Sequence, residues 1–386
     1  RDRLRSRGLG DVYKRQYKQG RDIMAQACYL HVPFCRHICA YCDFTRCGYH
    51  ETLADKWVSA VVKEIQEKLQ APLKTMYIGG GTPSALSYEQ LNVLLTALDP
   101  YIQECEEYTM EANIESFSED KIALCYHHGI NRISLGVQTL QPKLLKIIER
   151  KHTKEEVLSK IKEIKKNGID NISIDLIYGL PEQTMTMWKE DLEEIVTNFP
   201  IEHISLYALT IEEHSKFGRM GVKNIDPEVE EDMYAFAQEY LPKHGFYQYE
   251  ISNFSKQGKE SKHNCMYWKY EDFYGIGCGA SGKEQHVRYD NTKNIHTYIT
   301  QGSVANCITL NKEDEMFELI MMNLRLKKGM DLNHFKELFQ VDFEEKYASV
   351  LQKQIEKGML AISDGYIKAT EKGYPLLNDI LIDFME

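Results

Sequence analysis

YLHVPFCRHICAYCDF, residues 29–44, is a short apolar run that leads directly into three closely spaced cysteines, Cys35, Cys39 and Cys42. Thiolates hold iron–sulfur clusters in proteins, and a [4Fe–4S] cube normally takes four of them. Three thiolates leave one iron of such a cube open to a small molecule. The spacing therefore predicts a [4Fe–4S] cluster whose fourth ligand is exchangeable.

Two other interpretations of these cysteines stay open on the residues alone. The first is a zinc site, although zinc sites usually combine CxxC pairs with further Cys or His residues at matching spacing. The second is that three cysteines fall on one loop by chance. A disulfide scaffold is disfavoured, because ten cysteines in 386 residues are few for one.

Outward from this stretch, short β-rich runs alternate with amphipathic segments, which is typical of a parallel sheet wrapped by helices. The six runs expected as strands are Cys28–Val32, Thr75–Gly79, Tyr108–Ala112, Arg132–Val137, Asn171–Leu176 and His203–Ala208. The helical segments between them include Leu53–Leu69, Lys154–Asn167 and Met187–Thr197. Six such units predict an α/β fold with a partial, TIM-like (β/α)6 barrel, whose chemistry lies at the carboxyl ends of the strands.

The rhythm changes after about Gly245, where a glycine- and aromatic-rich stretch is too irregular for another plain βα unit. The last part of the chain predicts helices over Glu313–Arg325, Leu332–Phe339 and Phe343–Lys357, a β pattern over Met359–Lys368 and a final helix over Pro375–Phe384. These elements indicate a small C-terminal winged-helix-like α+β unit. We therefore expect a barrel over 24–245, a segment that lines a ligand site over 246–310, and a C-terminal helical, winged-helix-like domain over 311–386.

The first sixteen residues carry six basic and two acidic side chains and show no hydrophobic periodicity. They resemble translated sequencing-adapter material, so residues 1–16 are expected to be a non-native tail, with Met24 as a native start. Removing their net charge of +4 from the formal −11 leaves −15. Such an acidic chain is disfavoured as a nucleic-acid binder. No apolar run is long enough for a membrane span or placed as a secretion signal, so we expect a cytoplasmic protein that is not integral to a membrane.

The cysteine triplet, with Tyr41 just before its third member, resembles the signature of the radical S-adenosylmethionine (SAM) superfamily. The blocks GGGTP (79–83), MEAN, SLGVQ and SIDLIYGLP follow in order and resemble the branch that contains HemW haem chaperones and oxygen-independent coproporphyrinogen III oxidase. The resemblance implies that the open iron binds SAM. It implies SAM-binding roles for Tyr29, Tyr41, Gly80, Gly81, Thr82, Glu111, Gln138, Arg150 and Asp175. Each of these residues also has a structural alternative, such as a turn, a helix cap or a solvated charge.

Within this branch, the residues resemble the HemW family. The oxidase motif is CxxxCxxCxC, with a further cysteine at the position that corresponds to Phe44 here. A second feature is the block HNCMYW at residues 263–268, which resembles the block linked with haem binding in HemW proteins. The resemblance implies His263 as an axial haem ligand, with Asn264, Tyr267 and Trp268 beside it; the alternative is that these side chains belong to the core. One departure is EANIES (111–116), where relatives usually have EANPGT, so this loop keeps Glu111 but lacks their Pro-Gly turn.

The favoured hypothesis is a haem chaperone that binds a [4Fe–4S] cluster, SAM and haem, and passes haem to acceptor haemoproteins, with respiratory, membrane-associated proteins among the candidates. In that case the chain is a chaperone rather than a coproporphyrinogen III dehydrogenase, and no catalytic residue is assigned. The alternative is a radical SAM oxidoreductase that oxidatively decarboxylates coproporphyrinogen III. A zinc-binding regulator with a winged-helix tail is a third hypothesis, which the acidic charge and the missing fourth ligand disfavour.

Overall fold

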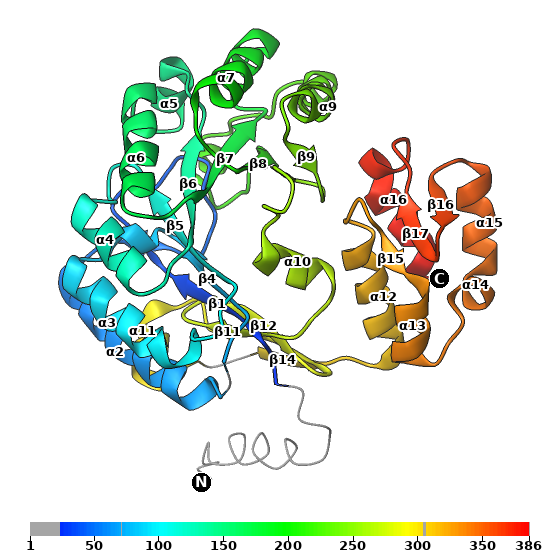
Figure 1. Cartoon of the computed structure of the whole chain (residues 1–386), viewed down its shortest axis with the longest axis horizontal. Helices are drawn as coiled ribbons and strands as arrows, with labels where there is room; N and C mark the ends of the chain where they lie inside the picture. Colours follow the sequence, from blue (N-terminus) through cyan, green and yellow to red (C-terminus); the bar gives the residue numbers. More distant parts are fainter. Residues whose placement is uncertain (1–23, 71, 304–305, 386) are drawn as a thin grey trace.

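The computed structural model describes residues 24–70, 72–303 and 306–385 (Figure 1). The expected non-native tail, residues 1–16, lies outside these ranges. Six parallel strands stand side by side in the order β1 (Ala27–Val32), β4 (Thr75–Gly80), β5 (Glu107–Asn113), β6 (Arg132–Gln138), β7 (Asn171–Tyr178) and β8 (His203–Ala208). All six predicted strands are confirmed, with ends that differ by at most two residues.

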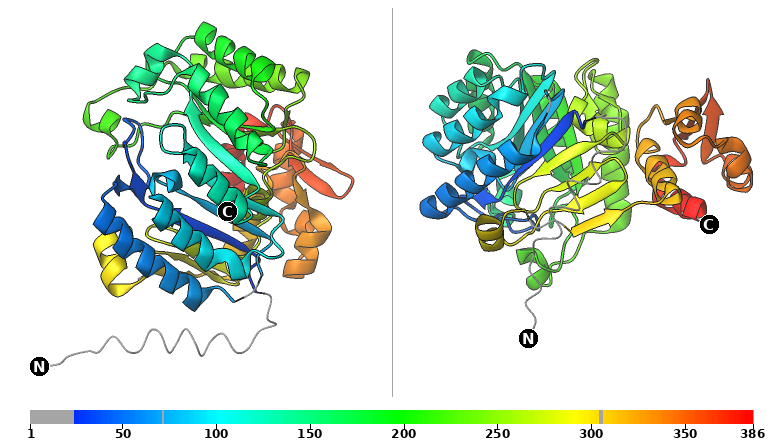
Figure 2. Two further views of the ribbon diagram at one scale, coloured as in Figure 1. Left: turned by 60° about the vertical axis from the view of Figure 1, so that its left-hand side comes forward. Right: turned by 90° about the horizontal axis from the view of Figure 1, so that it is seen from below.

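Helices cover the outer face of these strands, as the left view of Figure 2 shows. They are α2 (Glu51–Lys68), α3 (Tyr88–Leu98), α4 (Glu119–His127), α6 (Lys154–Lys166), α7 (Met185–Asn198) and α9 (Pro227–Lys243). The apolar stripes of α2 and α7 bury Trp57 and Trp188 completely in the main core. Capping boxes at Ser87 and Thr153 satisfy the first free N–H groups of α3 and α6. The alternation of period-2 and period-3.6 segments therefore predicted the partial barrel correctly.

The segment that was expected to be irregular, 246–310, extends the sheet at both edges. Beside β1 it adds β11 (Phe273–Ile276), followed by β12 (Ser281–Glu284), β13 (Val287–Asp290) and β14 (Asn306–Thr309); beside β8 it adds β10 (Asn253–Ser255) and β9 (Tyr247–Gln248). Only β11 is parallel to its barrel neighbour. The described residues thus form one twelve-stranded sheet. The sequence pattern missed the added strands because runs of two to four residues are too short to show a period.

The C-terminal unit has its own core and a three-stranded sheet in the order β15 (Met330–Asp331), β17 (Tyr366–Ala369) and β16 (Leu360–Ser363). Its helices are α12 (Lys312–Asn323), α13 (Leu332–Phe339), α14 (Phe343–Lys346), α15 (Ala348–Glu356) and α16 (Leu377–Ile382). The predicted helix over 343–357 is therefore two helices, which are separated at Tyr347. The unit lies beside the barrel (Figures 1 and 2) and joins it at Trp268, whose carbonyl accepts a hydrogen bond from Asn323 Nδ2 at 3.0 Å.

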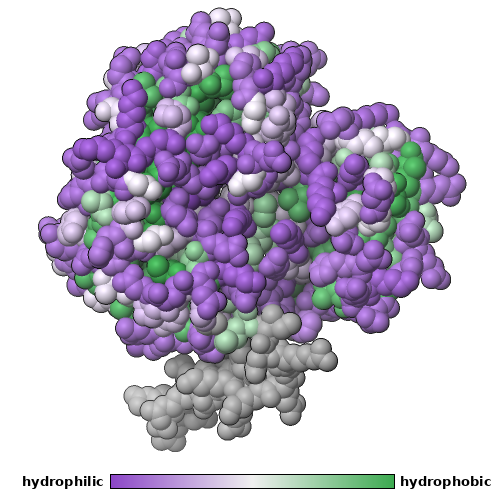
Figure 3. All heavy atoms as spheres, viewed as in Figure 1, coloured by the Kyte–Doolittle hydropathy of each residue, from purple (hydrophilic) through white to green (hydrophobic). Residues whose placement is uncertain are grey.

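The molecular surface agrees with an acidic, polar chain. The face drawn in Figure 3 is mainly hydrophilic, and apolar side chains show there only in scattered patches. In the parts of the chain that the structure describes, no helix has both the length and the apolar character needed to cross a lipid bilayer.

A short helix, α10 (Lys262–Trp268), covers the amino ends of β4 and β5. The carboxylate of Glu107, at the start of β5, accepts hydrogen bonds from Ser261 Oγ (3.2 Å) and from the backbone N–H groups of Lys262 and His263 (2.9 Å each). The N–H groups of Lys262 and His263 belong to the first turn of α10 and so have no partner within the helix. A buried side chain of the barrel therefore provides the cap that holds α10 in place.

Replacing Glu107 with alanine is expected to lower the free energy of unfolding by about 3–5 kcal/mol, because two buried donors and one partly buried donor lose their acceptor. Urea denaturation followed by circular dichroism measures this loss. The matched control is Glu106→Ala, since the Glu106 carboxylate pairs with Lys262 Nζ at 2.7 Å on the exposed surface and its removal should change little. Equal stability of the two variants would contradict the capping role.

Candidate cofactor site

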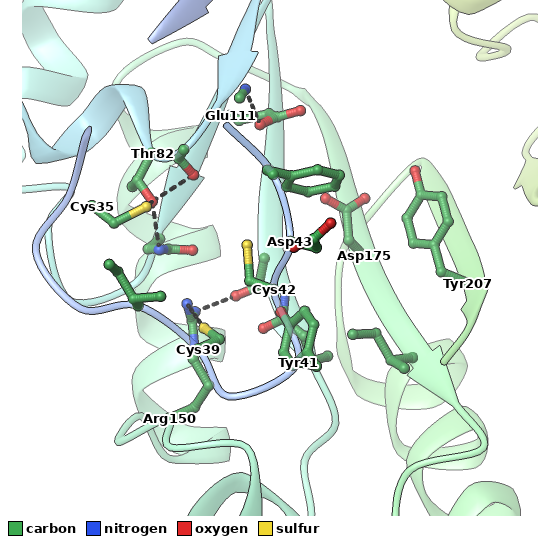
Figure 4. Close-up of a pocket in the computed structure, with 18 of the residues that line it drawn as sticks. Cys35, Cys39, Tyr41, Cys42, Asp43, Thr82, Glu111, Arg150, Asp175 and Tyr207 are labelled. Carbon is green, nitrogen blue, oxygen red and sulfur yellow. Dashed lines mark hydrogen bonds between the residues drawn. The ribbon is translucent and has the colours of Figure 1, made fainter. Parts of the chain in front are cut away.

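A cavity of about 500 Å³ opens at the carboxyl ends of strands β4 to β8 (Figure 4). Eleven of the twelve residues predicted for cluster and SAM binding line it: Cys35, Cys39, Tyr41, Cys42, Gly80, Gly81, Thr82, Glu111, Gln138, Arg150 and Asp175. Ligand sites of βα barrels lie at this end because the loops that follow the strands converge there. The fold thus brings together residues that are up to 140 positions apart in the sequence.

The three cysteines lie on the loop that follows β1, and the surrounding structure fixes this loop on both sides. Cys35 is buried, and the hydroxyl of Thr82 donates a hydrogen bond to its sulfur at 3.6 Å. Between Cys39 and Cys42, the backbone of Ala40 donates to the carbonyl of Ile148 and accepts from the N–H of Phe217. Burial raises the pKa of the Cys35 thiol to about 11, so deprotonation here needs a positive metal ion nearby.

The donor set fits a cluster with one open corner. Cys35, Cys39 and Cys42 are the cysteines of the cavity lining among the described residues. In the described ranges, no three His, Cys, Asp or Glu side chains converge on a single point as one metal ion would require. A cube binds each thiolate to a different iron, so its ligands do not need to converge in that way.

Glycines at the end of β4 let the backbone approach the cluster loop. Gly80 has φ = +110°, and a Cβ there would lie 2.6 Å from His31 Cε1; a Cβ on Gly81 would lie 2.8 Å from the carbonyl oxygen of Phe34. No side chain fits in either place. The GGGTP block therefore has a steric reason for its glycines, and its Thr82 is held towards the loop by Asn113 Nδ2 at 3.1 Å.

Two carboxylates face the cavity from the barrel interior. Glu111 on β5 accepts hydrogen bonds from Tyr77 Oη (2.9 Å) and the N–H of Gly80 (3.0 Å), and Asp175 on β7 accepts from Ser134 Oγ (3.0 Å). Burial, followed by repulsion from Asp175, raises the pKa of Glu111 to about 7; burial also raises the pKa of Asp175. Two acidic groups in a poorly solvated cavity favour a cationic ligand.

Arg150 lines the cavity although it does not follow a strand directly, so the rule that barrel sites lie at strand ends does not by itself predict its position. It follows α5 (Pro142–Ile147) and Glu149, whose φ of +63° turns the chain, and its guanidinium reaches Cys39 Sγ at 3.9 Å and the carbonyl of Gly136 at 2.6 Å. A non-glycine residue with positive φ is uncommon and costs about 1 kcal/mol or more. The same holds for Gln138, at φ = +65° on the cavity wall.

Tyr29 does not line the cavity. Its position in the middle of β1 places the side chain deeper in the barrel, where its hydroxyl and His31 Nδ1 lie 3.0 Å apart. Conversely, the prediction missed several lining residues, namely His37, Ile38, Asp43, Phe44, Asn113, Ser134, Tyr207, Leu209, Thr210 and Glu212. Asn113 ends β5 and Tyr207 is one residue from the end of β8, so the strand-end rule could have found both.

The proposed haem residues lie at the other end of the barrel, on α10. His263 is fully buried, with Nδ1 2.9 Å from Thr75 Oγ1 and Nε2 2.7 Å from the hydroxyl of Tyr267. Its ring also stacks on Tyr77, with centroids 5.3 Å apart. Burial lowers the pKa of His263 to about 3, so the imidazole is neutral. In this conformation the ring closes the barrel, and an iron bond at Nε2 requires Tyr267 to release it.

This chain is similar to known proteins over most of its length. Residues 29–195 match the radical SAM superfamily, and residues 310–376 match the HemN C-terminal domain. "Heme chaperone HemW" of Lactococcus lactis is 39% identical over 92% of this chain and 96% of that protein, and "Heme chaperone HemW" of Escherichia coli is 30% identical over 92% and 97%. The solved structure of coproporphyrinogen III oxidase (HemN) from Escherichia coli has the same fold, with a TM-score of 0.82, 20% identity and coverage of 93% of this chain and 90% of that one.

Proposed function

Because the chain belongs to the HemW family of the radical SAM superfamily, we propose that it is a haem chaperone that holds a [4Fe–4S] cluster and SAM in the barrel cavity and transfers haem to acceptor haemoproteins. The single observation that carries the cofactor part is the set of three cysteines, with no fourth among the described residues that line the cavity. The haem part is supported by the names of relatives, since this chain covers more than 90% of their length.

Nine residues that line the cavity have a role in this proposal. Cys35, Cys39 and Cys42 hold the cluster, and Gly80 and Gly81 border the space for SAM without a side chain in the way. Glu111, Gln138 and Asp175 offer hydrogen bonds and negative charge, which suits SAM because SAM carries a net positive charge. Arg150 directs N–H groups at the Cys39 sulfur and at the cavity. When bound, the cluster with SAM can supply one-electron chemistry.

The haem part of the proposal concerns the 246–310 segment. His263 is the candidate axial ligand, with Asn264, Tyr267 and Trp268 around it, and acceptors include respiratory haemoproteins at the membrane. The protein acts from the cytoplasm in this proposal. Because His263 is buried, loading requires α10 to move, and the contact between α10 and the C-terminal unit at Trp268 is where that motion would be transmitted.

Haem titration of the anaerobically reconstituted protein tests this proposal. The expected result is a saturable Soret band with no product from coproporphyrinogen III in the presence of SAM and reductant. His263→Ala should weaken haem binding at least tenfold, because the iron loses its axial ligand. Tyr267→Phe tests whether His263 is a haem ligand or only a core residue. The substitution removes the hydroxyl that lies 2.7 Å from His263 Nε2, so the haem affinity should stay equal or increase if His263 is the ligand.

Two outcomes would contradict the proposal. Steady decarboxylation of coproporphyrinogen III would make the chain an oxidoreductase. Unchanged haem affinity in His263→Ala, with unfolding at lower urea concentration, would make His263 a purely structural residue.

A further inference from the structure

An ion pair lies directly behind the cluster loop. Arg150 Nη1 is 3.9 Å from Cys39 Sγ, while its Nη2 is 3.6 Å from Glu115 Oε2. Glu115 Oε1 in turn lies 3.5 Å from His152 Nδ1. The arrangement joins a thiol of the proposed cluster to a carboxylate through one guanidinium group.

The two partners differ in exposure and in how firmly they are held. The Arg150 side chain is only 4% exposed and is anchored by the carbonyl of Gly136, whereas the Glu115 side chain is 41% exposed. Within the described residues, the buried Nε of Arg150 has no hydrogen-bond partner. Glu115 therefore neutralises Arg150 only in part, from the solvent side and without a close bidentate pair.

Glu115 and the cysteines come from different loops of the barrel. Glu115 lies in the EANIES turn after β5 and borders a second cavity of about 210 Å³, which shares Arg150 with the first. Arg150, like His37 and Asn113, borders both cavities, and its guanidinium contacts Cys39 through Nη1 and Glu115 through Nη2.

The electrostatic consequence follows from the charge of the cluster. Reduction adds an electron, so a positive group and N–H donors near its sulfurs stabilise the reduced form, and a nearby carboxylate opposes this. We propose that Glu115 is a positioning residue that acts through Arg150 to lower the reduction potential of the cluster. This inference rests on the proposed function, since it requires a cluster on Cys35, Cys39 and Cys42.

Glu149 provides a matched comparison. It borders the same second cavity and precedes Arg150 directly, but its carboxylate pairs with Lys216 Nζ at 2.5 Å rather than with Arg150. Replacing either glutamate with glutamine removes one negative charge from the same cavity. Only Glu115→Gln removes the negative charge that is paired with Arg150, the residue that contacts the Cys39 sulfur.

The experiment is a redox titration of the anaerobically reconstituted full chain, followed by electron paramagnetic resonance of the reduced cluster. We expect a more positive midpoint potential in Glu115→Gln and an unchanged one in Glu149→Gln. In a background of Arg150→Lys, which keeps the charge but loses the forked N–H groups, the effect of Glu115→Gln should be smaller.

The outcomes separate the inference from the function on which it rests. A wild-type potential in Glu115→Gln, or an equal shift in both glutamine variants, overturns the inference while the cluster itself stands. Failure of the wild type to take up about four irons overturns the cluster assignment instead. Because the comparison of Glu115→Gln with Glu149→Gln is decisive by itself, the result does not depend on whether the Arg150 variant folds.

Discussion

Cys39→Ala protein, reconstituted anaerobically with iron and sulfide, is expected to retain almost none of the about four irons per chain that the wild type should take up. Cys39 is partly buried and is the thiol that Arg150 contacts. With Cys39 removed, two protein ligands remain, and two corners of the cube would be exposed to water and thiols in solution. Iron analysis and the absorption spectrum after desalting measure the loss.

Cys47→Ala is the matched control for this prediction. Cys47 is only five residues beyond Cys42, but it belongs to β3 (Cys47–Gly48) and does not line the cavity. Its backbone N–H donates a hydrogen bond to the carbonyl of Pro33. Its removal should leave iron uptake unchanged. If both variants lost iron equally, Cys47 would be a ligand; if Cys39→Ala kept its iron, the cluster would not be where the sequence pattern puts it.

Local pattern was enough to predict the six strands of the barrel and the cysteine motif. The six strands have strong β-rich runs, and Glu111, Gln138 and Asp175, which the family resemblance singled out, lie on β5, β6 and β7 and line one cavity. Arg150 is held there by a left-handed residue after α5, which no periodicity reveals. Like the other three residues, it was identified by the family resemblance, and the structure gives the physical cause of its position.

The 246–310 segment could not be derived from the sequence for a different reason. Its position depends on long-range pairing: β11 pairs with β1, about 245 residues earlier, and Glu107 holds the first turn of α10. Such contacts leave no local signature in a short segment. The same long-range contacts explain why His263, an attractive ligand in sequence, is a fully enclosed side chain in the structure.

Glu111 is expected to make SAM binding depend on pH. The pKa of about 7 means that the carboxylate is largely protonated at pH 6 and largely ionised at pH 8. SAM carries a net positive charge, so it should bind the ionised form, and its dissociation constant should fall about tenfold between pH 6 and pH 8. Glu111→Gln should remove this dependence and bind SAM at least tenfold more weakly at pH 8. Isothermal titration calorimetry of the reconstituted protein with SAM, at pH 6 and at pH 8, measures both effects.

The same carboxylate should destabilise the protein when SAM is absent. Its folded-state pKa is raised above the usual 4.5, so the protonated form is favoured in the folded state and stability is lost as pH rises from about 4.5 to 7. At pH 8, ligand-free Glu111→Gln should therefore be more stable than the wild type by up to about 3 kcal/mol, although it binds SAM less well. The control is Glu106→Gln, just before the opposite end of the same strand, where the carboxylate faces solvent. A Glu111→Gln protein that lost stability at pH 8 would mean that Glu111 serves the fold through Tyr77 and Gly80 rather than the ligand.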